Sequence, residues 1–68
     1  MTNVDLLEDK IIKSGKKKTF LAARVGLSLV GFRRCCTNKA EFKASQIKIL
    51  CEELGIKTPK ERETIFFA

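Results

Sequence analysis

Apolar residues recur every three or four positions over most of the chain, the spacing that places them on one face of a helix. The first such run predicts a helix from Val4 to Ser14, with Leu6 and Ile12 widening its apolar face. Thr2 or Asn3 can cap the start of this helix, because both carry a side-chain oxygen.

The next two runs predict short helices separated by a tight turn. Leu21, Ala22 and Val25 indicate a helix over residues 18–25 that ends at Gly26. Ser28 then caps a third helix that ends near Cys36. In this third helix Phe32 and one of the two adjacent cysteines, Cys35 or Cys36, face inward, with the other cysteine partly exposed. Leu27 reaches the core from the turn itself.

Two more helices are expected in the last third of the chain. Residues 44–54 form a fourth helix with Phe42 entering the core just before it, and Thr58-Pro59-Lys60-Glu61 reads as a capping box that starts a fifth. The inner stripe of the fourth helix comprises Ala44, Ile47, Leu50, Cys51 and Leu54. Gly15, Gly26 and Gly55 follow the first, second and fourth helices, where a left-handed residue is expected.

With 68 residues, the chain has room for one domain and one core. We therefore expect a compact all-α domain of four to five helices over residues 1–68, in which residues 59–68 form a short last helix or tail. A substrate-enclosing enzyme does not fit this size.

Positive charge concentrates in the middle of the chain. The protein has 14 basic and 8 acidic residues, a formal charge of +6. From Lys10 to Lys48 there are eleven basic side chains and one acid, Glu41. A polyanion is the partner that such a segment favours, because each phosphate contact releases condensed counterions. The alternative is a solvated basic surface without a ligand.

Several function classes lack their usual residues. The chain has no histidine, no Cys-x-x-Cys pair and no carboxylate pair on an identifiable cleft. Neither a zinc site nor acid–base catalysis therefore has its parts, so we expect no enzyme, no metal and no cofactor. No stretch approaches the ~20 apolar residues of a membrane span, and no signal-peptide pattern opens the chain. We expect a cytoplasmic protein whose three cysteines are small core residues.

The stretch Leu21-Ala22-Ala23-Arg24-Val25-Gly26-Leu27-Ser28, followed by Phe32 and Cys35, resembles the helix-turn-helix of lambda-repressor-like regulators (Cro and phage-repressor, XRE type). The resemblance covers about residues 4–56 and includes the Leu54-Gly55-Ile56 end of the fourth helix. It implies that the second and third helices form a helix-turn-helix. It also implies a small Cro-like repressor, of phage or mobile-element origin, that reads the major groove of double-stranded DNA with the third helix.

The resemblance also implies which residues face DNA. They are Lys17, Lys18, Ser28, Leu29, Val30, Gly31, Arg33, Arg34, Asn38, Lys39 and Lys43. Arg33 and Arg34 are the candidates for contacts to guanine or phosphate. Leu29 and Val30 would meet thymine methyl groups, with Gly31 permitting close approach.

Two features depart from the family. Most members have a polar start to the recognition helix and an asparagine-glycine turn after it, whereas this chain has Leu29 and Val30 at the start and Asn38 in the turn. Asn38 can adopt the left-handed conformation that glycine would. Leu29 and Val30 keep a second interpretation, as plain apolar surface or as an interface for a partner.

The C-terminal Ile65-Phe66-Phe67 is a candidate dimer or partner surface, because two adjacent phenylalanines on one helix cannot both enter one small core. One expectation is a homodimer on a pseudo-palindromic operator. The alternative function is a protein-interaction module on the same fold, an antirepressor- or antitoxin-like partner of another regulator.

Overall fold

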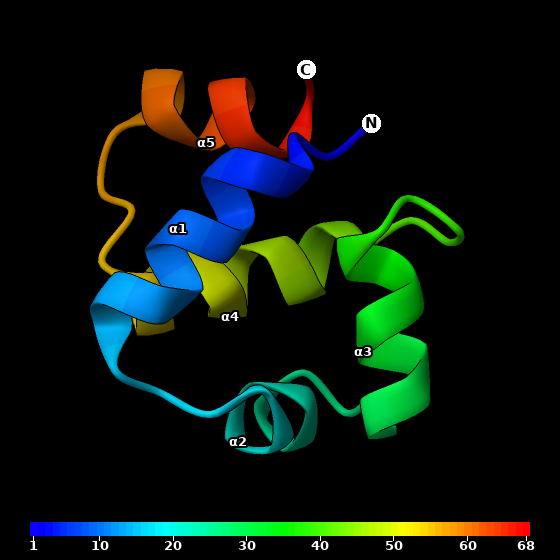
Figure 1. Ribbon diagram of the computed structural model, residues 1–68. Coiled ribbons are helices and arrows are strands. Elements are labelled where there is room, and N and C mark those ends of the chain that lie inside the picture. The colour runs from blue at the N-terminus through cyan, green and yellow to red at the C-terminus, as the bar shows by residue number, and fades with distance from the viewer.

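The computed structural model describes residues 1–68 and contains five helices and no strand (Figure 1). The helices are α1 (Val4–Ser14), α2 (Lys18–Arg24), α3 (Leu29–Cys36), α4 (Ala44–Leu54) and α5 (Pro59–Phe66). The all-α fold is confirmed, and the helices begin and end at or next to the residues expected from the sequence. None of these helices has the length and apolar character needed to cross a bilayer.

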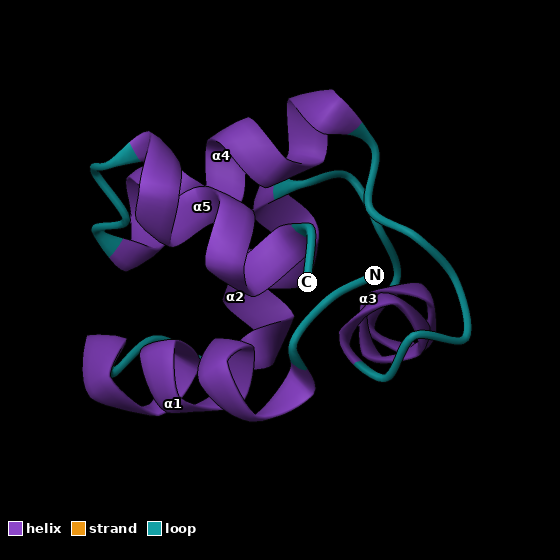
Figure 2. Cartoon of the chain, turned by 90° about the horizontal axis from the view of Figure 1, so that it is seen from above, coloured by secondary structure: helices purple, strands orange, loops and turns teal.

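Helix α1 packs against α3, α4 and α5, while α2 packs mainly against α3. Figure 1 shows α5 and the two chain ends at one end of the molecule and α2 at the other. Helix α3 runs along one edge, crosswise to α2, and Figure 2 shows it nearly end-on with no other helix beyond it. One side of α3 is therefore left open to solvent.

A single core holds the five helices together. It consists of Leu7, Ile11, Leu21, Ala22, Val25, Phe32, Cys35, Cys36, Phe42, Ile47, Leu50, Cys51, Leu54, Ile56, Ile65 and Phe66. Three rings form an edge-to-face series through it: Phe32 lies 5.8 Å from Phe42, and Phe42 lies 5.9 Å from Phe66, between ring centroids. This series joins α3 to α5 through the segment before α4, so the predicted role of Phe42 in the core is confirmed.

The helix ends follow the predicted chemistry with one departure, at Glu61, and one additional cap, at Lys43. Asn3, rather than Thr2, caps α1 by accepting a hydrogen bond from the Leu6 amide, and Thr58 Oγ1 accepts one from the Glu61 amide at the start of α5. The carboxylate of Glu61 pairs with Lys10 instead of closing the predicted box. At the start of α4, the amide of Lys43 donates to the side chain of Gln46, a cap that the sequence analysis missed.

Asn38 adopts the left-handed conformation expected of it, with φ of 64°, as Gly15, Gly26 and Gly55 also do. Its side chain has a second role. The side-chain Nδ2 of Asn38 donates to the Thr2 carbonyl at 2.8 Å, and the backbone amide of Thr2 donates to Asn38 Oδ1 at 2.8 Å. The first residues of the chain also bond to Ile65 and Ala68. Asn38 therefore ties the turn after α3 to the chain start and, through it, to the end of α5.

Substitution of Asn38 should separate these two roles. Asn38→Gly keeps the left-handed backbone but removes two hydrogen bonds, each with a net contribution of about 0.5–1.5 kcal/mol. Asn38→Ala removes the same two hydrogen bonds and, unlike glycine, keeps a Cβ in the left-handed region, at a cost of about 1–2 kcal/mol that the short polar side chain of asparagine eases. We expect the free energy of unfolding, measured by urea denaturation, to fall in the order wild type, Asn38→Gly, Asn38→Ala. Equal stability of all three proteins would contradict the tie.

Four expectations about burial were wrong. Ala44 is exposed, because it is the first residue of α4 and lies beyond the core. Ile12 is 73% exposed and Leu6 38%, so the buried face of α1 is narrower than its apolar pattern. Cys35 and Cys36 are both buried, because residues three and four positions after Phe32 both lie on its side of α3.

Candidate nucleic-acid interface

Helix α3 has a buried side and an exposed side of opposite character. Phe32, Cys35 and Cys36 face the core. Val30, Arg33, Arg34 and Thr37 are all exposed. Because Arg33, Arg34 and Thr37 lie three, four and seven positions after Val30, the four residues form one stripe along the outer side of the helix. Val30 is 69% exposed. The outer stripe therefore combines one apolar side chain with two guanidinium groups.

The start of α3 is held by Ser28. Its Oγ accepts a hydrogen bond from the Gly31 amide at 3.1 Å, which confirms the predicted cap. A Cβ on Gly31 would lie 3.3 Å from this Oγ, closer than ordinary contact. Gly31 thus leaves room for the cap, a reason for the glycine that the sequence analysis did not give. Leu29, the first residue of α3, is half-buried.

The eleven basic side chains between Lys10 and Lys48 divide into two groups. Five have a carboxylate partner: Lys10 with Glu61, Lys13 with Asp9, Lys16 and Arg24 with Glu53, and Lys18 with Glu8. The other six have none and are exposed: Lys17, Arg33, Arg34, Lys39, Lys43 and Lys48. We call these six the free cations.

Five of the free cations follow one another in the chain, on α3, in the loop after it and on the first half of α4. The sixth, Lys17, is the N-cap residue of α2. The basic middle of the sequence is thus largely neutralised over α1 and α2, and its uncompensated charge lies from α3 onward. A surface of unpaired guanidinium and ammonium groups is suited to phosphate oxygens and base edges.

No protein-family model, curated protein or solved structure matches this chain.

Besides Ser28, whose Oγ accepts from the Gly31 amide, two of the predicted DNA-facing residues have side chains engaged within the protein. Lys18 Nζ lies 2.7 Å from Glu8 Oε1, and the side chain of Asn38 is bonded to Thr2 at both ends of its amide. The other predicted residues, apart from Gly31, differ in the exposure of their side chains. Lys17, Ser28, Val30, Arg33, Arg34, Lys39 and Lys43 are exposed, and Leu29 is half-buried. Six of these exposed residues lie on α3, at its cap or in the segment after it, and the seventh, Lys17, lies at the start of α2.

Glu53 joins α4 to α2 through two cations. Lys16 Nζ lies 2.7 Å from Glu53 Oε1, and Arg24 Nε lies 2.8 Å from Glu53 Oε2. Lys16 also donates to the Glu53 carbonyl. The hydrogen bonds from Lys16 and then Arg24 hold the pKa of the Glu53 carboxyl below its usual value. This network pairs two cations of the basic segment with a carboxylate and holds α2 against α4.

The lowered pKa of Glu53 predicts a loss of stability in acid. A carboxyl whose folded pKa is lowered stabilises the fold above its ordinary pKa of about 4.3, and this contribution disappears as the pH falls through the lower folded value. Glu53→Gln cannot carry the charge. We expect wild type to exceed Glu53→Gln in urea midpoint at about pH 7 and the difference between the two midpoints to shrink in acid, as the Glu53 carboxyl becomes protonated. A difference that is independent of pH would contradict the ionic role of Glu53.

The C-terminal phenylalanines divide as the sequence suggested, but the proposed dimer surface shrinks. Ile65 and Phe66 are buried in the core and are not available to a partner, whereas Phe67 is 58% exposed. Phe67 and the exposed Met1 border a hollow of about 170 Å³ whose lining includes Phe42 and Phe66. Of the three residues expected to form a partner surface, only Phe67 can do so.

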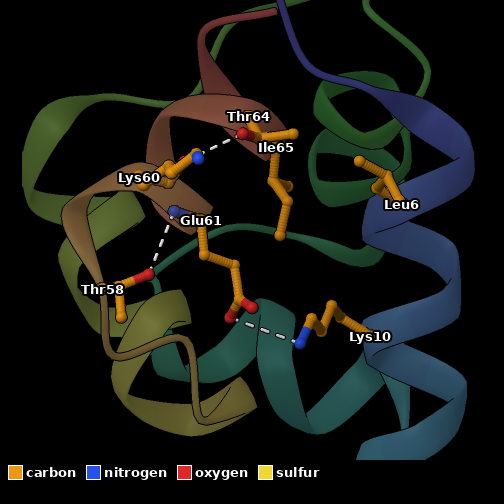
Figure 3. Close-up of a pocket in the computed structure, with 7 residues that line it drawn as sticks. All are labelled: Leu6, Lys10, Thr58, Lys60, Glu61, Thr64 and Ile65. Carbon is orange, nitrogen blue, oxygen red and sulfur yellow. Dashed lines mark hydrogen bonds and ion pairs between the residues drawn. The ribbon is translucent and has the colours of Figure 1, made fainter.

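A larger hollow, of about 390 Å³, lies between α1 and α5 (Figure 3). It is lined by Leu6, Lys10, Thr58, Lys60, Glu61, Thr64 and Ile65. Lys10 Nζ and Glu61 Oε1 face each other at 3.3 Å on one side, and the apolar side chains of Leu6 and Ile65 lie on the other. None of the predicted DNA-facing residues lines this hollow, so it is separate from the surface of α3.

The three cysteines are buried and are not disulfide-bonded. Burial raises the pKa of the Cys36 thiol to about 11, and it also raises the pKa values of Cys35 and Cys51. Because the thiolate is the reactive and metal-binding form, burial suppresses both kinds of chemistry at these residues. No three cysteine or carboxylate side chains converge in a group that could hold a metal ion.

Proposed function

We propose that this protein binds double-stranded DNA through the outer side of α3 and acts as a small sequence-specific regulator of transcription, with α2 and α3 serving as a helix-turn-helix. The observation that carries the proposal is the distribution of charge. Every basic side chain from Arg33 to Lys48 is exposed and has no carboxylate partner, whereas most of those before Arg33 are paired within the fold.

The shape of this region supports the same function. The major groove is about 12 Å wide and admits one α-helix. Helix α3 runs along an edge of the molecule (Figure 2), and the residues of its outer stripe are exposed. In this arrangement Arg33 and Arg34 reach base edges or phosphates from the helix, and Lys39 and Lys43 contact phosphates beside it. Lys17, at the start of α2, contacts the opposite flank of the groove.

The resemblance of residues 4–56 to lambda-repressor-like regulators favours transcriptional control over other uses of DNA binding. The order of the helices, the turn at Gly26 and the Ser28 cap all fit that resemblance. A small Cro-like repressor is the specific form that we propose.

The test is selection of the full chain on a pool of random duplex DNA, followed by affinity measurements at several salt concentrations. We expect an enriched sequence motif. The logarithm of the affinity should fall with the logarithm of the salt concentration with a slope no steeper than about −5 per bound chain, since at most six free cations meet phosphate. Binding that is weak and indifferent to sequence would overturn the proposal.

A second candidate is a protein-interaction module, which the exposed apolar side chains of Val30 and Phe67 favour. It differs from DNA binding in its response to mutation, because Val30→Ser and Phe67→Ser would abolish it while the arginines of α3 would matter little.

For the DNA-binding form we propose a homodimer through the surface around Phe67, since a single chain reads one short site. A sedimentation mass of one chain, both free at high concentration and on the selected duplex, would exclude this dimer.

A further inference from the structure

Val30 is the apolar member of the outer stripe of α3, and of the two apolar candidates at the start of this helix it is the exposed one. The neighbouring candidate Leu29 is half-buried, and Ser28 Oγ is occupied by the Gly31 amide. Val30 is 69% exposed and lies one turn before Arg33 and Arg34 on the same side of the helix. Val30 is therefore an exposed β-branched side chain beside two arginines, without a partner in the core.

We propose that Val30 recognises the C5 methyl group of a pyrimidine in the major groove, next to a guanine bound by Arg33 or Arg34. This inference rests on the proposed function. The C5 methyl of thymine is the apolar group that base pairs present in the major groove, and valine has no donor or acceptor to offer any other feature there. Val30 therefore acts as a specificity-determining residue.

The geometry of α3 sets the spacing of the two contacts. Three or four residues of helix rise about 4.5–6 Å, and successive base pairs are about 3.4 Å apart. The methylated pyrimidine and the guanine bound by an arginine should therefore lie one or two base-pair steps apart. A motif with this spacing is expected in the selected DNA.

Cytosine methylation should then control binding at this position. Cytosine and thymine differ at C4, where one presents an amino donor and the other a carbonyl acceptor. Because Val30 can bond to neither group, the methyl is what it distinguishes. A site with cytosine in place of the thymine should bind weakly, and 5-methylcytosine should restore much of the affinity.

The experiment uses the full chain and the selected duplex, in which each thymine in turn is replaced by deoxyuridine, a change that removes one methyl group. At one thymine position of each half-site, the replacement should weaken wild-type binding about fourfold, the effect of one buried methyl-sized group. Val30→Ser, which replaces the apolar group by a hydroxyl, should bind the thymine and deoxyuridine duplexes equally. The matched control is Ile12→Ala, another exposed apolar residue, which should keep the wild-type preference for thymine. Circular dichroism checks that both variants fold.

Two results would overturn the inference while leaving the proposed function intact: equal binding of every deoxyuridine duplex by wild type, or a preserved preference for thymine in Val30→Ser. In both, selection of a specific motif still supports DNA binding. A failure of 5-methylcytosine to improve binding over cytosine would also contradict the role of the methyl group. If no duplex is bound specifically, the inference and the proposed function are overturned together.

Discussion

Replacement of Phe32 by alanine should unfold a large fraction of the protein at 37 °C. Phe32 is fully buried and contacts Phe42 edge-to-face in the series of rings that joins α3 to α5. Truncating a buried phenylalanine costs about 3–5 kcal/mol. A domain of this length has a total stability of only about 3–10 kcal/mol. The single substitution therefore removes a third or more of the stability, and at the lower end all of it.

The measurement is urea and thermal denaturation followed by circular dichroism, with Phe67→Ala as the matched control. Phe67 is the same residue type at the C-terminal end of α5, but it is 58% exposed. Its loss should therefore change the stability of the single chain by no more than about 0.5 kcal/mol. A Phe32→Ala protein that melts within a few degrees of wild type would show that the core does not depend on the aromatic series.

The helices could be predicted closely because their ends carry local signals. Gly15 and Gly55 are each left-handed at the end of a helix, and Ser28 and Thr58 each cap a helix through their own side chains. Such signals act over three or four residues, so they can be read without knowledge of the tertiary fold. The apolar spacing then identified most of the core in the same way.

The features that could not be predicted depend on contacts between distant residues. Nothing in the local sequence shows that Lys16 and Arg24 share Glu53, which lies on α4 and far along the chain. The hydrogen bond between Asn38 and Thr2 likewise joins residues 36 positions apart. For this reason the sequence indicated the basic segment as a whole, and only the structure distinguishes its paired cations from its free ones.

This distinction changes the candidate site. Lys18 was grouped with Lys17 by sequence, but Lys18 is paired with Glu8 and only Lys17 remains free. Lys48, which the resemblance did not include, belongs to the free cations. Leu29 and Val30 were equivalent in the sequence, and their different exposure leaves Val30 as the apolar residue available to a ligand. The site is thus smaller than the sequence suggested and is centred on the outer stripe of α3.

Arg33→Ala and Arg34→Ala should each weaken binding to the selected DNA, but by different amounts if one arginine reads a base and the other a phosphate. An arginine that holds guanine through two hydrogen bonds contributes about 1–3 kcal/mol of discrimination, equivalent to about 5–150-fold in affinity. Its loss should relax the preference at one position of the motif. An arginine on phosphate should weaken the selected and a scrambled duplex alike and reduce the salt slope by about 1.

Two further variants make this result interpretable. Lys57→Ala removes an exposed cation after α4 that has no carboxylate partner, so it measures the effect of net charge alone. Arginine-to-lysine replacement keeps the charge of the α3 residues but cannot supply the paired donors that guanine requires. We expect lysine to rescue a phosphate contact and to fail at a base contact. If both alanine variants bind the selected DNA no more weakly than Lys57→Ala does, α3 is not the reading helix, because its only polar groups of sufficient reach would then be dispensable.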